Sequence, residues 1–316
     1  MAVLVTGGAG YIGSHVARLL GADAVIVDDL STGTETRTAG YVAEHLDLAS
    51  PAATLALEGI IREHNVDSVI HLAARKMVGE SVERPEWYYS QNIGGMANLL
   101  TAMRNTGVKK LVFSSSAATY GMPDTETVTE DFDCKPINPY GETKLIGEWM
   151  AKDAARAWGL RHVNLRYFNV AGAGAPELAD TAVANLIPIV FAAIRSGQKV
   201  KVFGDNYPTP DGTCIRDYVH VQDLAEAHVL ALGYLDREVR EFDTFNVGSG
   251  QGASVFAVID VIHQTVGFDF DVEIAEARAG DPARLCADVS RIENALGWKA
   301  KHDLKEIVRS AWDAIS

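Results

Sequence analysis

The sequence predicts an α/β protein: a doubly wound parallel sheet followed by a smaller, mixed α/β C-terminal domain. Two observations carry this prediction. Apolar runs of strand length alternate with helical stretches through the first half of the chain, and a glycine-rich turn follows the first run. Repeated strand–helix units give parallel strands joined by right-handed crossovers. The alternation loosens after Asn169. We therefore expect one domain over 1–172 and a second over 173–316, with part of 213–248 returning to the first.

The individual elements follow from apolar runs, caps and breakers. Strands are expected at 2–6, 24–27, 41–46, 67–73, 110–114, 162–167, 200–203 and 244–247. Helices are expected at 14–20, 50–64, 85–105, 140–158, 185–196, 221–235, 255–266 and from 304 onward. Ser50 and Pro51 are expected to open the second of these helices, as cap and first helical residue.

Composition excludes several classes of partner. A net charge of −14 over 316 residues argues against nucleic acid and against an anionic membrane surface. No apolar run approaches the ~20 residues that would span a bilayer. The three cysteines are scattered and the histidines show no paired ligand spacing, so neither disulfides nor a metal site is expected. The first strand starts at Ala2 with no secretory signal before it, which favours the cytoplasm.

The glycine-rich turn has the spacing of a dinucleotide-binding loop. Gly7, Gly10 and Gly13 lie between the first strand and a helix. In a Rossmann-type sheet the first glycine makes the turn, the second lets a phosphate approach, and the third lets the helix pack closely. The pyrophosphate then lies on free N–H groups at the helix start, here near Tyr11 and Ile12. Asp28 ends the second strand, where a carboxylate accepts bonds from ribose hydroxyls and repels a 2′-phosphate, so NAD is expected.

A second pattern predicts acid–base chemistry. Tyr140 and Lys144 lie four residues apart, on one face of an expected helix. A free tyrosine is a poor base because its pKa is ~10. A cation ~4 Å away at an effective dielectric of 20 favours the phenolate by roughly 4 kcal/mol, or about three pKa units. We therefore expect Lys144 to lower the pKa of Tyr140. Ser114–Ser116 ends an earlier strand and supplies a hydroxyl that can share the substrate proton.

Together these patterns resemble the extended short-chain dehydrogenase/reductase superfamily and, within it, the family of UDP-glucose 4-epimerases. The resemblance covers nearly the whole chain. Two stretches outside the cofactor domain are the more specific, namely Tyr207-Pro208-Thr209-Pro210-Asp211-Gly212-Thr213 and Ile215-Arg216-Asp217-Tyr218-Val219-His220. Leu165-Arg166-Tyr167-Phe168-Asn169 and Val78-Gly79-Glu80-Ser81 also match.

The resemblance implies an isomerase that interconverts UDP-glucose and UDP-galactose. Tyr140 removes the proton of the sugar 4-hydroxyl, hydride passes from C4 to bound NAD, the 4-keto sugar rotates, and hydride returns to its other face. Lys144 binds the nicotinamide ribose and Ser116 orients the 4-hydroxyl. Asp47, Leu48 and Lys76 join the cofactor residues. The implied UDP-sugar site comprises Ser116, Asn169, Asn185, Leu186, Phe203, Arg216, Arg278, Asp281 and Leu285. The family also implies a homodimer, paired through the helices at 85–105 and 140–158.

Some positions depart from the family pattern. Ala118 stands where a threonine is common, Asp29 where an asparagine is common, and Leu285 at a position where a tyrosine accompanies plain hexoses. Nucleotide-sugar dehydratases and decarboxylases need a carboxylate directly after the active-site hydroxyl, and Ala117-Ala118 supplies none. A UDP-uronate 4-epimerase and a non-enzymatic NAD-sensing protein stay open as alternatives, although the intact Tyr140 and Lys144 disfavour the latter.

Overall fold

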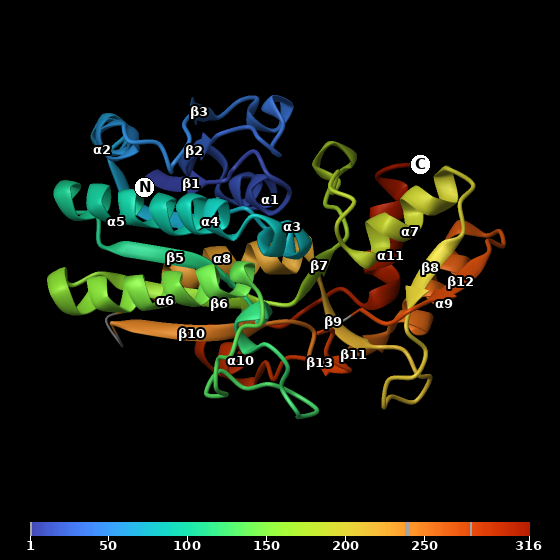
Figure 1. Cartoon of the computed structure of the whole chain (residues 1–316). Coiled ribbons are helices and arrows are strands. Elements are labelled where there is room, and N and C mark those ends of the chain that lie inside the picture. The colour runs from blue at the N-terminus through green and yellow to red at the C-terminus, as the bar shows by residue number, and fades with distance from the viewer. Residues whose placement is uncertain (1, 238–240, 279) are drawn as a thin grey trace. The chain divides into compact units, whose positions relative to one another are not determined.

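The computed structural model describes residues 2–237, 241–278 and 280–316 (Figure 1). The chain divides into two compact units. Unit 1 comprises 1–119, 134–166 and 225–245, and unit 2 comprises 120–133, 167–224 and 246–316. The division into domains at residue 172 stays a prediction.

A seven-stranded sheet has the order β10-β6-β5-β4-β1-β2-β3 and confirms the doubly wound α/β prediction. The pairs β1–β2, β1–β4, β2–β3 and β4–β5 are parallel. Because β1 lies between β2 and β4, the winding reverses at β1, and ligands of such sheets bind beside the carboxyl ends of the strands there. The strands are β1 (Ala2–Thr6), β2 (Ala24–Asp28), β3 (Val42–His45), β4 (Val66–His71), β5 (Lys110–Ser116), β6 (Arg161–Tyr167) and β10 (Phe242–Val247).

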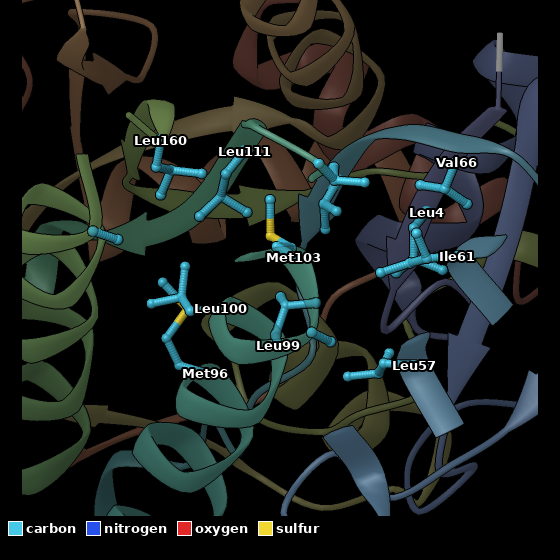
Figure 2. Close-up of a cluster of buried hydrophobic side chains, with 14 of the residues drawn as sticks. Leu4, Leu57, Ile61, Val66, Met96, Leu99, Leu100, Met103, Leu111 and Leu160 are labelled. Atoms are coloured by element: carbon cyan, nitrogen blue, oxygen red, sulfur yellow. The ribbon is translucent and has the colours of Figure 1, made fainter. Parts of the chain in front are cut away.

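Helices cover this sheet, and one side forms a continuous apolar core (Figure 2). Leu4 of β1 and Leu111 of β5 are fully buried beside Leu57 and Leu99 from two helices. Burying such side chains contributes ~1.5–3 kcal/mol each, which is what fixes the helices to the strands. The helices are α1 (Tyr11–Leu20), α2 (Ala53–Glu63), α3 (Val78–Glu83), α4 (Pro85–Tyr88), α5 (Gly94–Thr106), α6 (Pro139–Trp158) and α8 (Val221–Tyr234), with a π-helical turn η3 (Tyr89–Ile93) between α4 and α5.

Two expected helix starts are wrong. Helix α1 begins at Tyr11, three residues before the expected start at residue 14. Helix α2 begins at Ala53, so Ser50 and Pro51 form a turn before it instead of its cap and first residue. On α5, Met96, Leu99, Leu100 and Met103 all pack within the core. On α6 Leu145 is buried, but Trp149 is 55% exposed.

Unit 2 is built around β9 (Ile215–His220), a strand that the sequence pattern did not predict. Strands β7 (Asn169–Ala171) and β13 (Arg284–Leu285) pair with it in parallel and β11 (Gly252–Ser254) antiparallel. A separate parallel pair joins β8 (Val200–Phe203) to β12 (Val272–Ala275). The helices α7 (Leu186–Arg195), α9 (Val255–Val266) and α11 (Leu304–Asp313) share a core with these strands, and α10 (Ser290–Leu296) completes the unit.

Candidate active site

The glycine loop leaves β1 in a conformation that only glycine fits. Gly7 has φ +74°, and a Cβ there would lie 2.7 Å from the backbone nitrogen of Ala73. A Cβ on Gly13 would lie 2.1 Å from the carbonyl oxygen of Gly7, so the start of α1 packs directly on the loop. Gly10 is the N-cap of α1 and supplies no side-chain cap to its first turn, where Tyr11 and Ile12 lie. This is the geometry of an anion site at a helix N-terminus.

Asp28 fixes this loop to the end of β2. Its Oδ2 accepts the N–H of Ala9 at 2.9 Å, and its Oδ1 accepts the N–H of Leu30 at 2.9 Å. Burial raises the pKa of Asp28, whereas the two backbone N–H bonds oppose that shift. Each carboxylate oxygen keeps a second lone pair, which is what two ribose hydroxyls require.

The other expected cofactor residues differ in exposure. Asp47 is exposed after β3, where its Oδ1 accepts the N–H of Ala49 at 2.8 Å. Leu48 is buried in the core of unit 1, so its side chain serves packing and only its backbone can face a ligand. Lys76 is exposed in the loop after β4.

The three expected catalytic residues meet in unit 1, at the carboxyl end of β5 and the start of α6. Tyr140 and Ser116 are each 8% exposed and Lys144 is 3% exposed. The Ser116 hydroxyl hydrogen-bonds to the Tyr140 phenol. The Lys144 Nζ donates to the carbonyl oxygen of Ser114 at 2.7 Å and lies 5.9 Å from the centre of the Tyr140 ring.

The local sequence explains why α6 comes so close to β5. Asn138 caps the helix by accepting the N–H of Gly141 at 2.9 Å, and Pro139 takes the first helical position. A Cβ on Gly141 would lie 2.7 Å from the carbonyl oxygen of Ala118. The glycine after Tyr140 therefore lets the helix start against the segment that follows Ser116.

The electrostatics of this group correct one expectation. Burial raises the pKa of Tyr140, and the hydrogen bond from Ser116 only partly opposes this. Burial lowers the pKa of Lys144 to about 8. The expected lowering of the Tyr140 pKa by Lys144 is absent from the described site, because the ammonium points to the Ser114 carbonyl and desolvation of the phenolate dominates. His71 is buried and stacked on Phe113, and burial lowers its pKa to about 3, so it is a neutral core histidine.

Unit 2 brings together five of the expected UDP-site residues. The Arg278 guanidinium lies 3.9 Å from the centre of the Phe203 ring. Arg216 Nη2 donates to Asp281 Oδ1 at 2.6 Å. Leu285 of β13 is the register partner of Arg216 on β9, which places it beside this cluster. Ala279, within the Arg278–Asp281 stretch, lies outside the described residues.

The remaining three expected residues form a separate group in unit 2. Asn169 opens β7, and Asn185 is the N-cap of α7, which Leu186 begins. The Asn185 Nδ2 donates to the carbonyl oxygen of Val170 at 3.5 Å. The structure thus places eight of the residues expected for the UDP-sugar site in unit 2 and the ninth, Ser116, in unit 1.

Sequence reasoning missed two residues, one beside the clusters of unit 2 and one in unit 1. The Tyr207 hydroxyl is buried and has no hydrogen-bond partner among the described residues, and the charges of Asp281, Arg216 and Arg278 act on it. It belongs to a stretch that the family resemblance had already marked. The second is Arg75, next to Lys76. In the described parts of the chain, no group of three or more potential ligands is placed to hold a metal ion, and no helix there is long and apolar enough to cross a membrane.

A doubly wound sheet with this glycine loop and this buried Ser–Tyr–Lys group defines a dinucleotide-binding protein of the short-chain dehydrogenase/reductase type. The chain belongs to the NAD dependent epimerase/dehydratase family, whose model matches residues 3–248.

Individual relatives are similar over nearly the full length. The UDP-glucose 4-epimerase of Azospirillum brasilense is 46% identical over 98% of this chain and 90% of its own. The crystal structure of UDP-glucose 4-epimerase from Brucella ovis in complex with NAD has a TM-score of 0.93 at 43% identity, over 98% of this chain and 97% of that one. The UDP-Glc/GlcNAc 4-epimerase of Campylobacter jejuni has a TM-score of 0.86 at 40% identity, over 99% and 98%.

Proposed function

We propose that this protein is an NAD-dependent isomerase that interconverts UDP-glucose and UDP-galactose by inverting the sugar at C4. The observation that carries the proposal is the buried Ser116–Tyr140–Lys144 group at the carboxyl end of β5, in a chain that aligns with UDP-glucose 4-epimerases over nearly its full length. This group can move a proton without any net redox change, as an epimerisation requires.

The residues around the glycine loop fit NAD. The spaces at Gly7 and Gly13 are closed to a side chain, the N-cap of α1 makes no side-chain bond to the first turn, and Asp28 is held toward the loop by two backbone bonds. We propose that NAD is held by this loop, by Tyr11 and Ile12, by Asp47, Leu48 and Lys76, and by Tyr140 and Lys144. When bound, NAD supplies an acceptor for the C4 hydride and gives the hydride back.

The protein's own residues then handle the proton. The Tyr140 phenol oxygen takes the proton of the sugar 4-hydroxyl and later returns it. The Ser116 hydroxyl stabilises the phenolate, since its hydrogen bond is the influence that lowers the pKa of Tyr140. The Lys144 ammonium, held by the Ser114 carbonyl, provides positive charge on the same helix. Because the site is buried, these interactions are stronger than they would be in water.

The clusters in unit 2 suit the UDP part of the substrate. Arginines bind phosphate oxygens in bidentate fashion, and an aromatic ring can cover a uracil. We propose Arg216 and Arg278 for the pyrophosphate and Phe203 for the base. Asp281, Asn169, Asn185, Leu186 and Leu285 complete the proposed site.

The test is product analysis with purified protein and UDP-galactose. We expect UDP-glucose to accumulate until the ratio of UDP-glucose to UDP-galactose is constant, without added cofactor. A 4-keto-6-deoxy sugar from UDP-galactose would indicate a dehydratase. With UDP-glucuronate offered instead, a pentose would indicate a decarboxylase, and epimerisation of this substrate alone would indicate a uronate epimerase. No product at all would favour an NAD-sensing protein.

Two further properties belong to this proposal. A homodimer paired through α6 is supported by Trp149, which is 55% exposed on that helix. Light scattering should give twice the 34.0 kDa of the chain, and Trp149→Glu should shift the mass toward the monomer. A location in the cytoplasm is supported by the free thiols of Cys134, Cys214 and Cys286, and cell fractionation tests it.

A further inference from the structure

The side chain of Arg75 joins two loops that are far apart in the sequence. Arg75 lies four residues after the end of β4, in the loop that leads to α3. Its Nη2 donates to Asp29 Oδ2 at 2.6 Å, and its Nη1 donates to the hydroxyl of Ser31. Asp29 comes directly after β2. The pair is partly shielded, with the side chain of Arg75 19% exposed and that of Asp29 26% exposed.

The ion pair crosses the carboxyl end of β1. In the sheet β1 lies between β4 and β2, and Thr6 is the register partner of both His71 and Val27. A side chain that reaches from the loop after β4 to the loop after β2 must therefore pass over the point where the glycine loop begins. That point is where a dinucleotide lies on a sheet of this kind.

Other contacts hold the arginine in this direction. Its guanidinium lies 5.0 Å from the centre of the Trp87 ring, and Gln91 Oε1 accepts from its Nη2 at 3.0 Å. The backbone N–H of Arg75 donates to Asn92 Oδ1 at 2.8 Å. Little rotamer entropy remains to be lost when the pair forms. Asp29 also accepts hydrogen bonds from the N–H and the hydroxyl of Ser31. Burial raises the pKa of Asp29, but these bonds and the charge of Arg75 outweigh burial and lower the pKa, so Asp29 is charged at neutral pH.

We propose that Asp29 and Arg75 form a strap over the adenosine–pyrophosphate half of NAD and set the rate at which NAD leaves. The inference rests on the proposed function, because it takes NAD as the occupant of the glycine loop. A dinucleotide held under the strap departs only after the charge-assisted bond between the two side chains breaks. Because the pair is partly exposed, dissolved salt screens it.

The test measures release of radiolabelled NAD from purified holoprotein into excess unlabelled NAD. Arg75→Met and Asp29→Asn should each release NAD about tenfold faster, the effect of losing one charge-assisted bond. Release from wild type should accelerate with added salt, whereas release from both variants should not. The double variant should release NAD no faster than either single variant, because both changes remove the same bond.

Arg84→Met is the matched control. Arg84 lies 4.0 Å from the centre of the same Trp87 ring but pairs with Glu80 on α3, and it does not reach the loop after β2. Arg84→Met should release NAD at the wild-type rate. The fluorescence of Trp87 should change in both Arg75→Met and Arg84→Met, because each variant removes an arginine beside that ring. Wild-type release from Arg75→Met and Asp29→Asn would overturn the strap and leave the proposed function standing. A wild-type protein that holds no NAD would instead overturn the proposed function.

Discussion

The ammonium nitrogen of Lys144 lies 2.7 Å from the carbonyl oxygen of Ser114. This bond joins the second turn of α6 to β5, two residues before Ser116. It also turns a buried cation toward the strand and away from the phenol of Tyr140, whose ring centre is 5.9 Å from the same nitrogen. Helix α6 and strand β5 are therefore held together by one of the residues expected to take part in the reaction.

Tyr140→Phe should keep the fold and the cofactor but lose most of its turnover. Phenylalanine fills the same buried space, yet it cannot accept the proton of the 4-hydroxyl. General acid–base catalysis contributes ~10²–10⁴-fold. The measurement is kcat with UDP-galactose, alongside the NAD content of each preparation. A kcat near that of wild type would show that another group is the base.

Lys144 should make stability depend on pH in a defined window. Its pKa is lowered from 10.5 to about 8 in the folded protein, so between these values the unfolded chain binds more protons than the folded one. The free energy of unfolding contributed by this group therefore rises from pH 8 to pH 10 and is constant below that range. Urea unfolding of the NAD-free protein should show this rise in wild type, relative to Lys144→Met. Equal pH profiles would mean that Lys144 is not buried as a cation.

A buried ion pair one turn further along α6 should contribute more to the stability of the fold than an exposed pair on the same helix. The carboxylate of Glu148 accepts two hydrogen bonds from Arg166, from Nε at 2.9 Å and from Nη2 at 2.6 Å, and both side chains are 7% exposed. Glu148→Gln leaves a buried guanidinium without its counter-charge, which costs about 3–5 kcal/mol. The control is Asp153→Asn, because Asp153 and its partner Arg156 are 75% and 64% exposed, and it should change stability little.

Thermal or urea unfolding compares the two variants. Similar losses for Glu148→Gln and Asp153→Asn would contradict the structural role of the buried pair. If Glu148→Gln also lowers kcat without raising KM, Glu148 is a positioning residue for Lys144, which lies four residues before it on α6.

Leu285 should widen the range of UDP-sugars that the protein epimerises. Leu285 is the register partner of Arg216. In the proposed site a leucine here, which lacks the ring and phenol of tyrosine, would leave more space by C2 of the sugar. A misfit of methyl size changes binding by only ~1–3 kcal/mol, so selectivity should be graded. We expect efficient epimerisation of UDP-glucose and UDP-galactose, with weaker activity on UDP-N-acetylglucosamine. Leu285→Tyr should raise the ratio of kcat/KM for the plain over the N-acetylated sugar. An unchanged ratio would show that another residue shapes the pocket.

The sequence was most informative where structure is local. The run Ala2–Thr6 and the glycines after it predicted β1 and a helix after the turn, because strand propensity and turn chemistry act over a few residues, although α1 begins at Tyr11 instead of at residue 14. The strand β9 was missed because its neighbours β7, β11 and β13 are short and come from distant parts of the chain. The direction in which the pKa of Tyr140 shifts was missed, because burial raises it and the spacing of residues in the sequence does not reveal burial.

Pairs that meet only in three dimensions were likewise out of reach. Asp29 was noticed as an unusual charge, but its partner Arg75 lies 46 residues away. The contact depends on β1 separating β2 from β4, which is a property of the whole sheet. The two buried residues Glu148 and Arg166 were also separate features of the sequence, one on α6 and one on β6.

The π-helical turn Tyr89–Ile93 gives the helix between Pro85 and Thr106 one residue more than an unbroken α-helix would hold. Tyr89 reaches Glu142 of α6 from this turn, while Asn92 donates to Thr143 Oγ1 at 2.9 Å and to the carbonyl oxygen of Arg75 at 3.1 Å. A π-helical turn takes up its extra residue by widening locally, so deleting a single residue here would restore regular α-helical winding and remove the wider turn that carries Tyr89 and Asn92. Segment length, as well as residue identity, therefore keeps these three partners within reach, and a gap of one position in this stretch would be costlier than most substitutions.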